Sequence, residues 1–322
     1  MSASPAERDV EPKRSSKISI VVPVYRSEQS LSALVTGLVE VLTAMERPFE
    51  IVLVDDCSPD NSWRELVRLR EQFGKVVRPA RLLTNSGQHN AILCGFSLVT
   101  GDVVVTMDDD LQNPPDQVPH LVAAIDQGYD LAIGAYERKM HDRVTNAKGR
   151  FIDWLQRRMF SLPSKFQLTS FRAIRRSVVD AVNQMGGSYP YITSMLLSNV
   201  SKYVNVTVRH EPRKFGTSNY SMRRGISLAS NLLLSYSTYP VMFVAVLCAI
   251  TFLISMCYGA WVIYSAVRYG TSMAGWASIV VAMSFFNGMI LLALFIQSVY
   301  LSRLNRQITK SRHAYRIGEL PD

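Results

Sequence analysis

The sequence predicts an α/β domain with a mixed, mainly parallel sheet, followed by an interfacial amphipathic helix and two transmembrane helices. Short apolar runs alternate with amphipathic segments over the first half of the chain. Such alternation indicates right-handed βαβ units and therefore parallel strands. Towards the end of the chain, segments 240–267 and 276–301 are almost free of charged residues.

The hydrophobic pattern predicts each element of the α/β domain in turn. Residues 18–24 form the first apolar run and are expected to be a strand. Apolar residues between Leu31 and Leu42 then recur at the spacing of an amphipathic helix. Gly101 is suited to stop a later helix. The same patterns predict strands at 50–54, 80–83, 102–107 and 130–134, and helices at 62–73 and 88–99.

An acidic motif follows one of these strands. Asp108, Asp109 and Asp110 come directly after the apolar run 103–105 and before the turn-forming sequence Asn-Pro-Pro at 113–115. They are therefore expected at the carboxyl end of a core strand, where open α/β sheets bind ligands. Alternation places Asp108 and Asp110 on one side, where a divalent cation would relieve their repulsion. The alternative is a solvated acidic turn.

Other polar residues also follow predicted strands. Tyr25, Asp55, Asp56 and Asn85 should gather at the same edge as the acidic motif. The chain has neither G-x-G-x-x-G nor G-x-x-x-x-G-K-[ST], so a nucleotide must be held by side chains and a metal. Asp55 or Asp56 could accept hydrogen bonds from a base or a ribose, and Pro23 and Tyr25 could form an apolar wall. Each polar residue could instead cap a helix or close a turn.

The two apolar segments near the end of the chain are each long enough to cross a bilayer, which requires roughly 20 residues. The alternative is a pair of buried core helices. Basic residues are abundant after residue 301, whereas the connection 268–275 offers only Arg268. By the positive-inside rule, the α/β domain and both termini are expected in the cytosol.

These observations divide the chain into a disordered N-terminus (1–17), a cytosolic domain (18–221), an interfacial helix (222–239), a transmembrane hairpin (240–301) and a basic cytosolic tail (302–322). The interfacial helix is predicted because apolar and basic residues are interspersed there, and domain packing is the alternative.

The composition limits the partners of the chain. The net charge of +9 fits a surface that meets anionic lipid. No helix-turn-helix, zinc or RNA-binding signature occurs, so nucleic acid is not expected. The four cysteines lack metal-type spacing.

Several motifs together point to one family. They lie at 22–25, 54–60, 85–88, 108–115, 171–176 and 213–221. In this order, and followed by paired membrane helices, they resemble family 2 glycosyltransferases of GT-A fold, in the branch that acts on polyprenyl phosphates. That branch includes dolichyl-phosphate mannose synthases and bacterial transferases that load glucose or aminoarabinose onto undecaprenyl phosphate. The resemblance runs from about Ile18 to Arg316.

The resemblance implies a role for individual residues. The uridine pocket would comprise Pro23, Tyr25, Glu28, Asp55 and Asp56. Metal and diphosphate ligands would be Asp108, Asp110 and Gln112. Groups near the sugar diphosphate and the acceptor phosphate would be Arg172, Arg213 and Ser218. Of all these, the expected catalytic residues are Asp108, Asp110, Arg172 and Arg213. Further substrate-binding candidates are Asn85, Gln88, Asp109, Arg138 and Arg175.

The implied reaction moves a sugar from a nucleoside diphosphate sugar, expected to be UDP-linked, to undecaprenyl phosphate. It would invert the anomeric centre, use Mg²⁺ or Mn²⁺, and serve cell-envelope modification at the bacterial inner membrane. Because the acceptor is already an anion, no strong general base is needed. Phosphate binding favours arginine, and the basic candidates are Arg138, Lys148, Arg150, Arg172, Arg175 and Arg213.

The chain departs from the family pattern at three places. Arg26 stands where Asn is usual, and Cys57 stands where Gly is usual. Relatives carry an Asp shortly before Phe-Arg, whereas residues 165–170 read Lys-Phe-Gln-Leu-Thr-Ser. This last departure concerns sugar recognition.

Two other functions remain open. A processive polysaccharide synthase would need more spanning helices and a Gln-x-x-Arg-Trp signature, which residues 154–158 do not supply. A membrane adaptor that binds a sugar nucleotide without turnover is the non-enzymatic alternative. Because membrane-helix pairs of this type often associate, a homo-oligomer is an alternative to a monomer.

Overall fold

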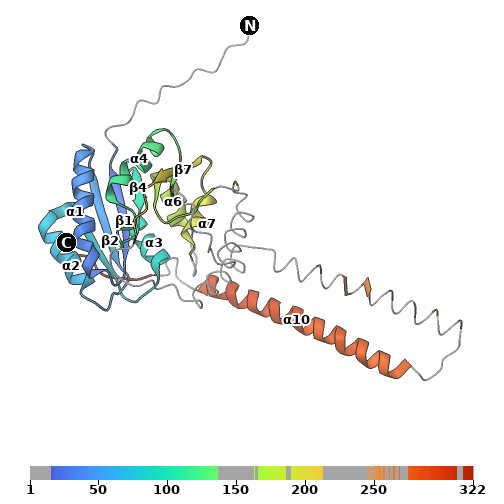
Figure 1. The fold of residues 1–322 in the computed structure, drawn as a ribbon. Helices are drawn as coiled ribbons and strands as arrows, with labels where there is room; N and C mark the ends of the chain where they lie inside the picture. The colour runs from blue at the N-terminus through green and yellow to red at the C-terminus, as the bar shows by residue number, and fades with distance from the viewer. Residues whose placement is uncertain are drawn as a thin grey trace, which may run out of the picture. The chain divides into compact units, whose positions relative to one another are not determined.

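The computed structural model describes residues 16–136, 163, 166–185, 190–212, 275–309 and 315–321, together with isolated positions between 246 and 268. The chain forms two compact units. One consists of residues 1–219 and 311–322, and the other consists of residues 220–310. Figure 1 shows the sheet and its helices in the first unit, and helix α10 in the second.

The described part of the first unit contains an eight-stranded mixed sheet in the order β7-β5-β6-β4-β1-β2-β3-β8. Strand β1 pairs in parallel with β2 and β4, β2 with β3, and β5 with β7. Strand β6 is antiparallel to β4 and β5, and β8 is antiparallel to β3. The predicted mixed, mainly parallel sheet is confirmed. The strands are β1 (Ile18–Val24), β2 (Phe49–Asp55), β3 (Val77–Leu82), β4 (Val103–Thr106), β5 (Leu131–Tyr136), β6 (Arg172–Arg175), β7 (Tyr203–Val208) and β8 (Ile317–Glu319).

Helices cover both faces of the sheet (Figure 1). They are α1 (Glu28–Ala44), α2 (Ser62–Phe73), α3 (Gln88–Leu98), α4 (Val118–Asp126), α6 (Arg176–Gln184) and α7 (Ile192–Leu197), with short 3₁₀ turns η1 (Gly74–Val76) and η2 (Pro115–Gln117). Because side chains alternate along a strand, Ile20 and Val22 of β1 pack with α1, α2 and α4, while Val21 packs with α3 and α6. Burial on both faces explains why these strands read as continuous apolar runs.

Most elements expected from the sequence are present. The helix predicted at 62–73 is α2, and the strand predicted at 80–83 is β3, which begins at Val77. Gly101 does not stop the helix as expected, because α3 ends at Leu98 and, among the described glycines, those with positive φ are Gly74, Gly87 and Gly128. Gly101 is needed for a close approach instead. A Cβ there would lie 2.6 Å from the Ser19 Oγ and 2.7 Å from the Lys17 carbonyl oxygen.

The two ends of the α/β domain differ from their predicted boundaries. Ser16 and Lys17, assigned to a disordered terminus, are held by hydrogen bonds, since Arg47 Nε donates to the Ser16 carbonyl oxygen at 3.0 Å. The basic tail predicted at 302–322 is also partly structured. Residues 317–319 form β8, with Glu319 opposite Arg81 of β3. A three-residue strand with a glycine at its centre has no hydrophobic pattern that predicts it.

The second unit contains α10 (Trp276–Thr309), which begins where the second membrane helix is predicted. Large apolar side chains along it are exposed, including Met283 at 64%, Leu291 at 67% and Phe295 at 65%. Among the residues that the structure describes, no helix combines the length and the apolar character needed to cross a membrane. The predicted interfacial helix (222–239) and most of the first predicted span (240–267) lie outside the described residues. The two-span hairpin stays a prediction.

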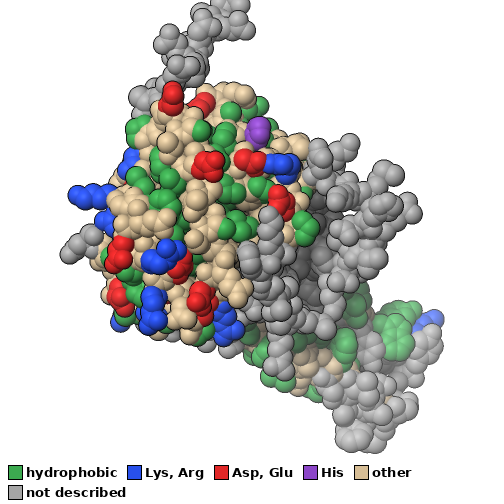
Figure 2. All heavy atoms as spheres, turned by 60° about the vertical axis from the view of Figure 1, so that its left-hand side comes forward, with side chains coloured by type: hydrophobic (Ala, Val, Ile, Leu, Met, Phe, Trp, Pro, Cys, Tyr) green, Lys and Arg blue, Asp and Glu red, His purple; other side chains and the backbone are tan. Residues whose placement is uncertain are grey.

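Charged side chains of both signs lie side by side on the face shown in Figure 2. The net charge of +9 is therefore not gathered on this face.

Candidate active site

The ends of three neighbouring parallel strands form the candidate site. Strands β1, β2 and β4 run in the same direction, so the loops that follow them meet at one edge of the sheet. The loops are also bonded to each other, because the Asp56 backbone N–H donates to the Val24 carbonyl oxygen at 2.9 Å. The Tyr25 backbone N–H donates to Asp109 Oδ2 at 3.1 Å. The gathering of polar residues that the sequence predicts at this edge is therefore present.

Asp109 ties the acidic motif to the loop after β1. Its carboxylate accepts hydrogen bonds from the Tyr25 backbone and from the Ser27 hydroxyl. Burial raises the pKa of Asp109 to about 6, although these two hydrogen bonds act in the opposite direction. Asp109 is a predicted substrate-binding residue, yet its contacts are those of a residue that orients a loop.

Asp108 contacts other residues than Asp109 does, and it accepts hydrogen bonds from two neutral groups. Gln88 Nε2 donates to Asp108 Oδ1 at 2.6 Å, and the Ser170 hydroxyl donates to Asp108 Oδ2 at 2.5 Å. Burial raises the pKa of Asp108, and the Asp110 charge raises it further. A cation placed between the two carboxylates would relieve both effects.

The remainder of the motif is fixed by backbone bonds. The Gln112 backbone N–H donates to Asp110 Oδ1 at 3.1 Å, and the Glu211 backbone N–H donates to the Gln112 carbonyl oxygen at 2.9 Å. Asn113 is buried and accepts a hydrogen bond from the Tyr136 hydroxyl at 3.0 Å. Burial raises the pKa of Tyr136 to about 12. Tyr136 therefore supports the acidic loop as a neutral phenol.

A buried arginine lies behind the acidic motif. Arg172 is only 3% exposed, and its Nη1 donates to the Thr193 hydroxyl at 3.3 Å. Burial lowers its pKa, while Tyr191 and Asp108 favour its charged form. His89 is next to this group and makes an edge-on contact with Tyr191, with ring centroids 5.1 Å apart. Burial and the Arg172 charge lower the pKa of His89 to about 4, so its imidazole is neutral at pH 7.

Asp55 and Asp56 lie at the end of β2 and are both buried. Asp55 is fully buried, accepts the Ser58 backbone N–H at 3.2 Å and forms an ion pair with Arg81 Nε at 3.2 Å. Asp56 accepts the backbone N–H groups of Ser86 at 2.6 Å and Gly87 at 2.8 Å. Burial raises the pKa of both carboxyls. These contacts close turns, which is the alternative role that the sequence left open for Asp55 and Asp56. The contacts of Asp56 also fix the loop before α3.

Three residues at this edge adopt left-handed backbone conformations. Arg26 has φ 58°, Cys57 has φ 55° and Leu111 has φ 60°. They follow β1, β2 and β4, so each loop of the site contains one. Arg26 and Cys57 are the positions where the family usually has Asn and Gly, the two residues that adopt this conformation most readily. The departures therefore keep a required backbone shape, at a cost of roughly 1–2 kcal/mol each. Strained residues of this kind cluster at functional sites.

The prediction that Arg175 binds the substrate is wrong. Arg175 lies at the opposite edge of the sheet, because β6 is antiparallel to β4 and Arg175 pairs with Val103 at the start of β4. It forms an ion pair with Asp130 at 3.3 Å. Arg172, at the other end of β6, pairs with Thr106 and is on the correct side.

The remaining predicted site residues fall into three groups. Asn85 and Glu28 are exposed, and Glu28 accepts hydrogen bonds from Asn61 Nδ2 at 3.3 and 3.4 Å. Pro23 is buried in β1, opposite Val54 of β2. Outside the described residues lie Arg138, Lys148, Arg150, Arg213 and Ser218. Sequence reasoning missed Ser170, His89, Tyr191, Thr193 and Tyr136.

The side-chain atoms of the acidic motif that could bind a metal ion are oxygen atoms. Over the described ranges, no group of three or more His, Cys, Asp and Glu side chains is arranged to hold a metal ion. Asp108 and Asp110 supply two carboxylates, and Mg²⁺ commonly binds through one or two carboxylates together with substrate phosphates. The residues present therefore fit a hard divalent cation bound together with a diphosphate.

Comparison with solved structures identifies the fold. Glucosyl-3-phosphoglycerate synthase from Mycobacterium tuberculosis, in complex with Mn²⁺ and uridine-diphosphate-glucose, matches with a TM-score of 0.50 and 18% sequence identity. The match covers 72% of this chain and 84% of that chain. A second structure of the synthase, with Mn²⁺, uridine diphosphate and phosphoglyceric acid, has a TM-score of 0.51. The α/β unit therefore has the GT-A-like mixed-sheet fold.

Comparison of sequences identifies the family. The model of glycosyl transferase family 2 matches residues 19–182. An undecaprenyl-phosphate 4-deoxy-4-formamido-L-arabinose transferase of Klebsiella pneumoniae is 32% identical over 259 residues, covering 80% of this chain and 79% of the relative. The enzyme of the same name from an Enterobacter species is 34% identical over 230 residues, covering 71% and 70% of the two chains. The chain thus belongs to glycosyl transferase family 2 and is a glycosyltransferase.

Proposed function

We propose that the protein transfers a sugar from a UDP-linked donor to undecaprenyl phosphate, with inversion at the anomeric carbon. The observation that carries this proposal is the meeting of the acidic motif, Asp55, Asp56 and buried Arg172 at one edge of a GT-A-like sheet. Relatives that are one third identical over most of their length are named as undecaprenyl-phosphate sugar transferases. Their names supply the acceptor class.

The donor nucleotide would bind at the ends of β1 and β2. Tyr25 is half-buried, with the Arg26 guanidinium 5.3 Å from its ring centroid, so the base would meet a pre-formed stack. Asp55 and Asp56 would accept hydrogen bonds from the base or ribose, and Glu28 and Asn85 are exposed beside them. This assignment follows the motif positions and the shared edge.

A divalent cation would be held by Asp108, Asp110 and Gln112 together with the donor diphosphate. When bound, Mg²⁺ or Mn²⁺ would neutralise the charge of the departing diphosphate and orient it. The residues around it have separate tasks. Gln88 and Ser170 fix the orientation of Asp108, and Asp109 fixes the loop through Tyr25 and Ser27.

The acceptor phosphate would attack without general-base catalysis. Its oxygen forms the new bond to the anomeric carbon, the bond from that carbon to the diphosphate oxygen breaks, and UDP leaves with the electron pair. No proton is transferred, because the acceptor oxygen is already anionic near neutral pH. The site must instead reduce repulsion between two anions. Arg172 contributes positive charge next to Asp108, and Arg138 and Arg213 are further candidates by sequence.

Attachment to the inner membrane would bring the lipid acceptor to the site. We assign this to residues 222–301, as an interfacial helix and a two-span hairpin with both termini in the cytosol. The exposed apolar side chains of α10 support this assignment, since large exposed apolar surfaces mark membrane or protein contacts. A cysteine introduced at 271–274 should be labelled from outside intact cells, whereas one at residue 321 should not. Labelling of both from outside would contradict it.

The reaction is tested by turnover of the purified full-length protein. UDP-sugars are offered with undecaprenyl phosphate, and the lipid product is identified by mass spectrometry. Undecaprenol, which lacks the phosphate, is the matched control acceptor. We expect one sugar per undecaprenyl phosphate and no transfer to undecaprenol. Products of increasing length would indicate a processive synthase instead, and sugar-nucleotide binding without turnover would indicate an adaptor.

A further inference from the structure

The end of the chain returns to the catalytic unit beside the nucleotide end of the site. Strand β8 pairs with β3, with Arg81 opposite Glu319 and Leu82 opposite Ile317. The Leu83 backbone N–H donates to the Arg316 carbonyl oxygen at 2.9 Å, which extends the pairing. Gly318 lies so close to this strand that a Cβ would be 2.9 Å from Leu83 Cδ2. The strand is therefore closely fitted to the edge of the sheet.

Tyr315 anchors the segment on the α3 side of the sheet. Its ring is 8% exposed and packs in the cluster that contains Val52, Val54 and Cys94. Its hydroxyl contacts the Ser97 hydroxyl at 3.1 Å and the Leu93 carbonyl oxygen at 3.4 Å. With one buried aromatic and one strand pairing, the segment has a fixed register on β3.

Glu319, near the free end of this segment, holds a guanidinium group. It accepts a hydrogen bond from Trp63 Nε1 at 3.0 Å and lies 3.7 Å from Arg81 Nη1. The Arg81 guanidinium also stands over the Trp63 ring, 5.7 Å from its centroid. Trp63 and Glu319 thus confine Arg81 from two directions, although the Glu319 side chain itself is 57% exposed.

The other side of the same guanidinium reaches the candidate site. Arg81 Nε is 3.2 Å from Asp55 Oδ2, and Asp55 is fully buried. Besides Arg81, this carboxylate accepts hydrogen bonds from the hydroxyl and the backbone N–H of Ser58. A buried carboxylate that loses a charged partner is strongly destabilised. Arg81 is partly exposed, at 30%, so its position depends on what confines it.

We propose that the C-terminal segment 315–319 is a positioning element for the donor nucleotide, in which Glu319 and Trp63 hold Arg81 against Asp55. The inference rests on the proposed function, which makes Asp55 a ligand of the nucleoside. Glu319, Trp63 and Arg81 are positioning residues, because they act through Asp55. The simpler alternative is that β8 merely covers the edge of β3, as added strands do in many sheets.

Nucleotide affinity separates these two roles. Binding of UDP with Mn²⁺ to the full-length protein is measured by calorimetry, and KM and kcat are measured for both substrates. Glu319→Gln keeps the strand and the shape of the side chain but removes its charge. It should weaken UDP binding about threefold, the size expected of a partly exposed ion pair. Arg81→Gln should weaken it about tenfold or more. KM for the lipid acceptor should stay unchanged in both variants.

The double variant makes the test specific. If Glu319 acts through Arg81, Glu319→Gln should have no further effect on UDP affinity in the Arg81→Gln background. Glu71→Gln is the matched control, because Glu71 is an exposed acid on α2, the helix that carries Trp63. It should leave UDP affinity unchanged.

Two results would overturn the inference. Unchanged UDP affinity in Glu319→Gln and Arg81→Gln, with only a lower melting temperature, would reduce β8 to an edge cover. If Glu319→Gln weakens UDP binding equally in the wild-type and the Arg81→Gln backgrounds, Glu319 does not act through Arg81. Failure of the wild-type protein to bind UDP is a different outcome, since it would contradict the proposed function and this inference together.

Discussion

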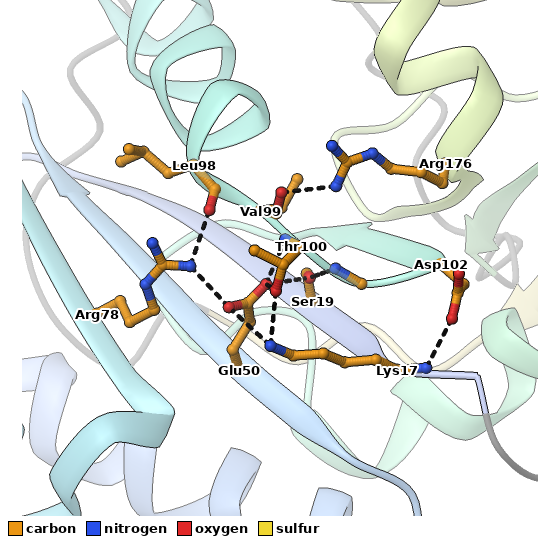
Figure 3. A network of polar contacts seen from close by, with 10 residues as sticks. Lys17, Ser19, Glu50, Arg78, Leu98, Val99, Thr100, Asp102 and Arg176 are labelled. Carbon is orange, nitrogen blue, oxygen red and sulfur yellow. Dashed lines mark hydrogen bonds and ion pairs between the residues drawn. The ribbon is translucent and has the colours of Figure 1, made fainter.

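The two edges of the sheet both contain buried carboxylates, but their surroundings differ. At the amino edge, Glu50 is 3% exposed and interacts with two cations, Lys17 Nζ at 3.1 Å and Arg78 Nη1 at 2.7 Å. Figure 3 shows these cations together with Ser19 and Thr100, which also donate to Glu50. Although burial raises the pKa of Glu50, the hydrogen bonds prevail and lower it to about 2.

At the carboxyl edge the balance is reversed. Asp108 receives hydrogen bonds from two neutral groups, Gln88 and Ser170, and has two charged neighbours, the Asp110 carboxylate and the buried Arg172 guanidinium. Burial prevails there, so the pKa of Asp108 is raised. Glu50, which accepts hydrogen bonds from Ser19 and Thr100 as well as from two cations, is fully satisfied and stabilises the fold. Asp108, with fewer donors and an acidic neighbour, retains the capacity to bind a cation or a substrate.

The largest expected effect is on catalysis at the carboxyl edge. Asp110→Asn removes one of the few anionic groups available to a metal, so lipid transfer should fall about 10²–10³-fold. The melting temperature should change little. Initial rates with undecaprenyl phosphate measure the loss, and wild-type turnover in this variant or in a chelator would rule out the metal assignment.

The matching effect at the amino edge is on stability. Glu50→Gln removes the buried charge that Lys17 and Arg78 contact and should lower the free energy of unfolding by about 2 kcal/mol. The donor KM of the folded protein should not change. Urea unfolding measures the first quantity, with Glu40→Gln as control, because Glu40 is an exposed acid on α1. A changed donor KM with unaltered stability would show instead that Glu50 serves substrate binding and not the stability of the fold.

Arg172 tests whether positive charge at the carboxyl edge is functional. Arg172→Lys keeps the charge but loses the planar fork that reaches Thr193 and the Ser170 carbonyl oxygen. Lipid transfer should fall about tenfold, and Arg172→Ala should be worse. Hydrolysis of the sugar nucleotide is assayed in parallel. If hydrolysis is retained while lipid transfer falls, Arg172 acts on the acceptor phosphate. Equal loss of both activities would indicate that it acts on the donor diphosphate. Full transfer by the Ala variant would exclude this arginine.

The smallest effect is the pH dependence of stability that Glu50 confers. Its folded-state pKa lies below its ordinary value of 4.5, so its contribution is fully present above pH 4.5 and is lost as the pH falls towards about 2. The difference in unfolding free energy between wild type and Glu50→Gln should therefore shrink over that interval. A difference that is constant from pH 5 to pH 2 would contradict the low pKa.

The sequence predicted the elements of the first half of the fold because their signals are local. Strands β1, β2 and β4 are continuous apolar runs, and α2 has a clear amphipathic pattern. It could not predict β8, whose partner β3 lies over two hundred residues earlier in the chain and whose three residues have no periodic pattern.

The site was predictable to the extent that strand ends determine it. The acidic motif, Tyr25 and Asp55 were expected at one edge and lie there. Arg175 was misplaced, because its assignment needed the direction of β6, which sequence did not supply. The bond between Ser170 and Asp108 was missed, since it joins residues 62 positions apart.

The most direct test of the account is a single paired measurement on Asp108→Asn and Glu50→Gln. Both variants exchange a carboxylate for an amide of the same shape, at half-buried Asp108 on the carboxyl edge and at buried Glu50 on the amino edge. Initial rates of lipid transfer are measured per folded molecule, beside the urea midpoint of each variant. We predict that Asp108→Asn loses transfer by at least about 10²-fold with a wild-type midpoint. We predict that Glu50→Gln keeps its rate with a lowered midpoint. Wild-type transfer by Asp108→Asn would contradict the assignment of the carboxyl edge as the active site.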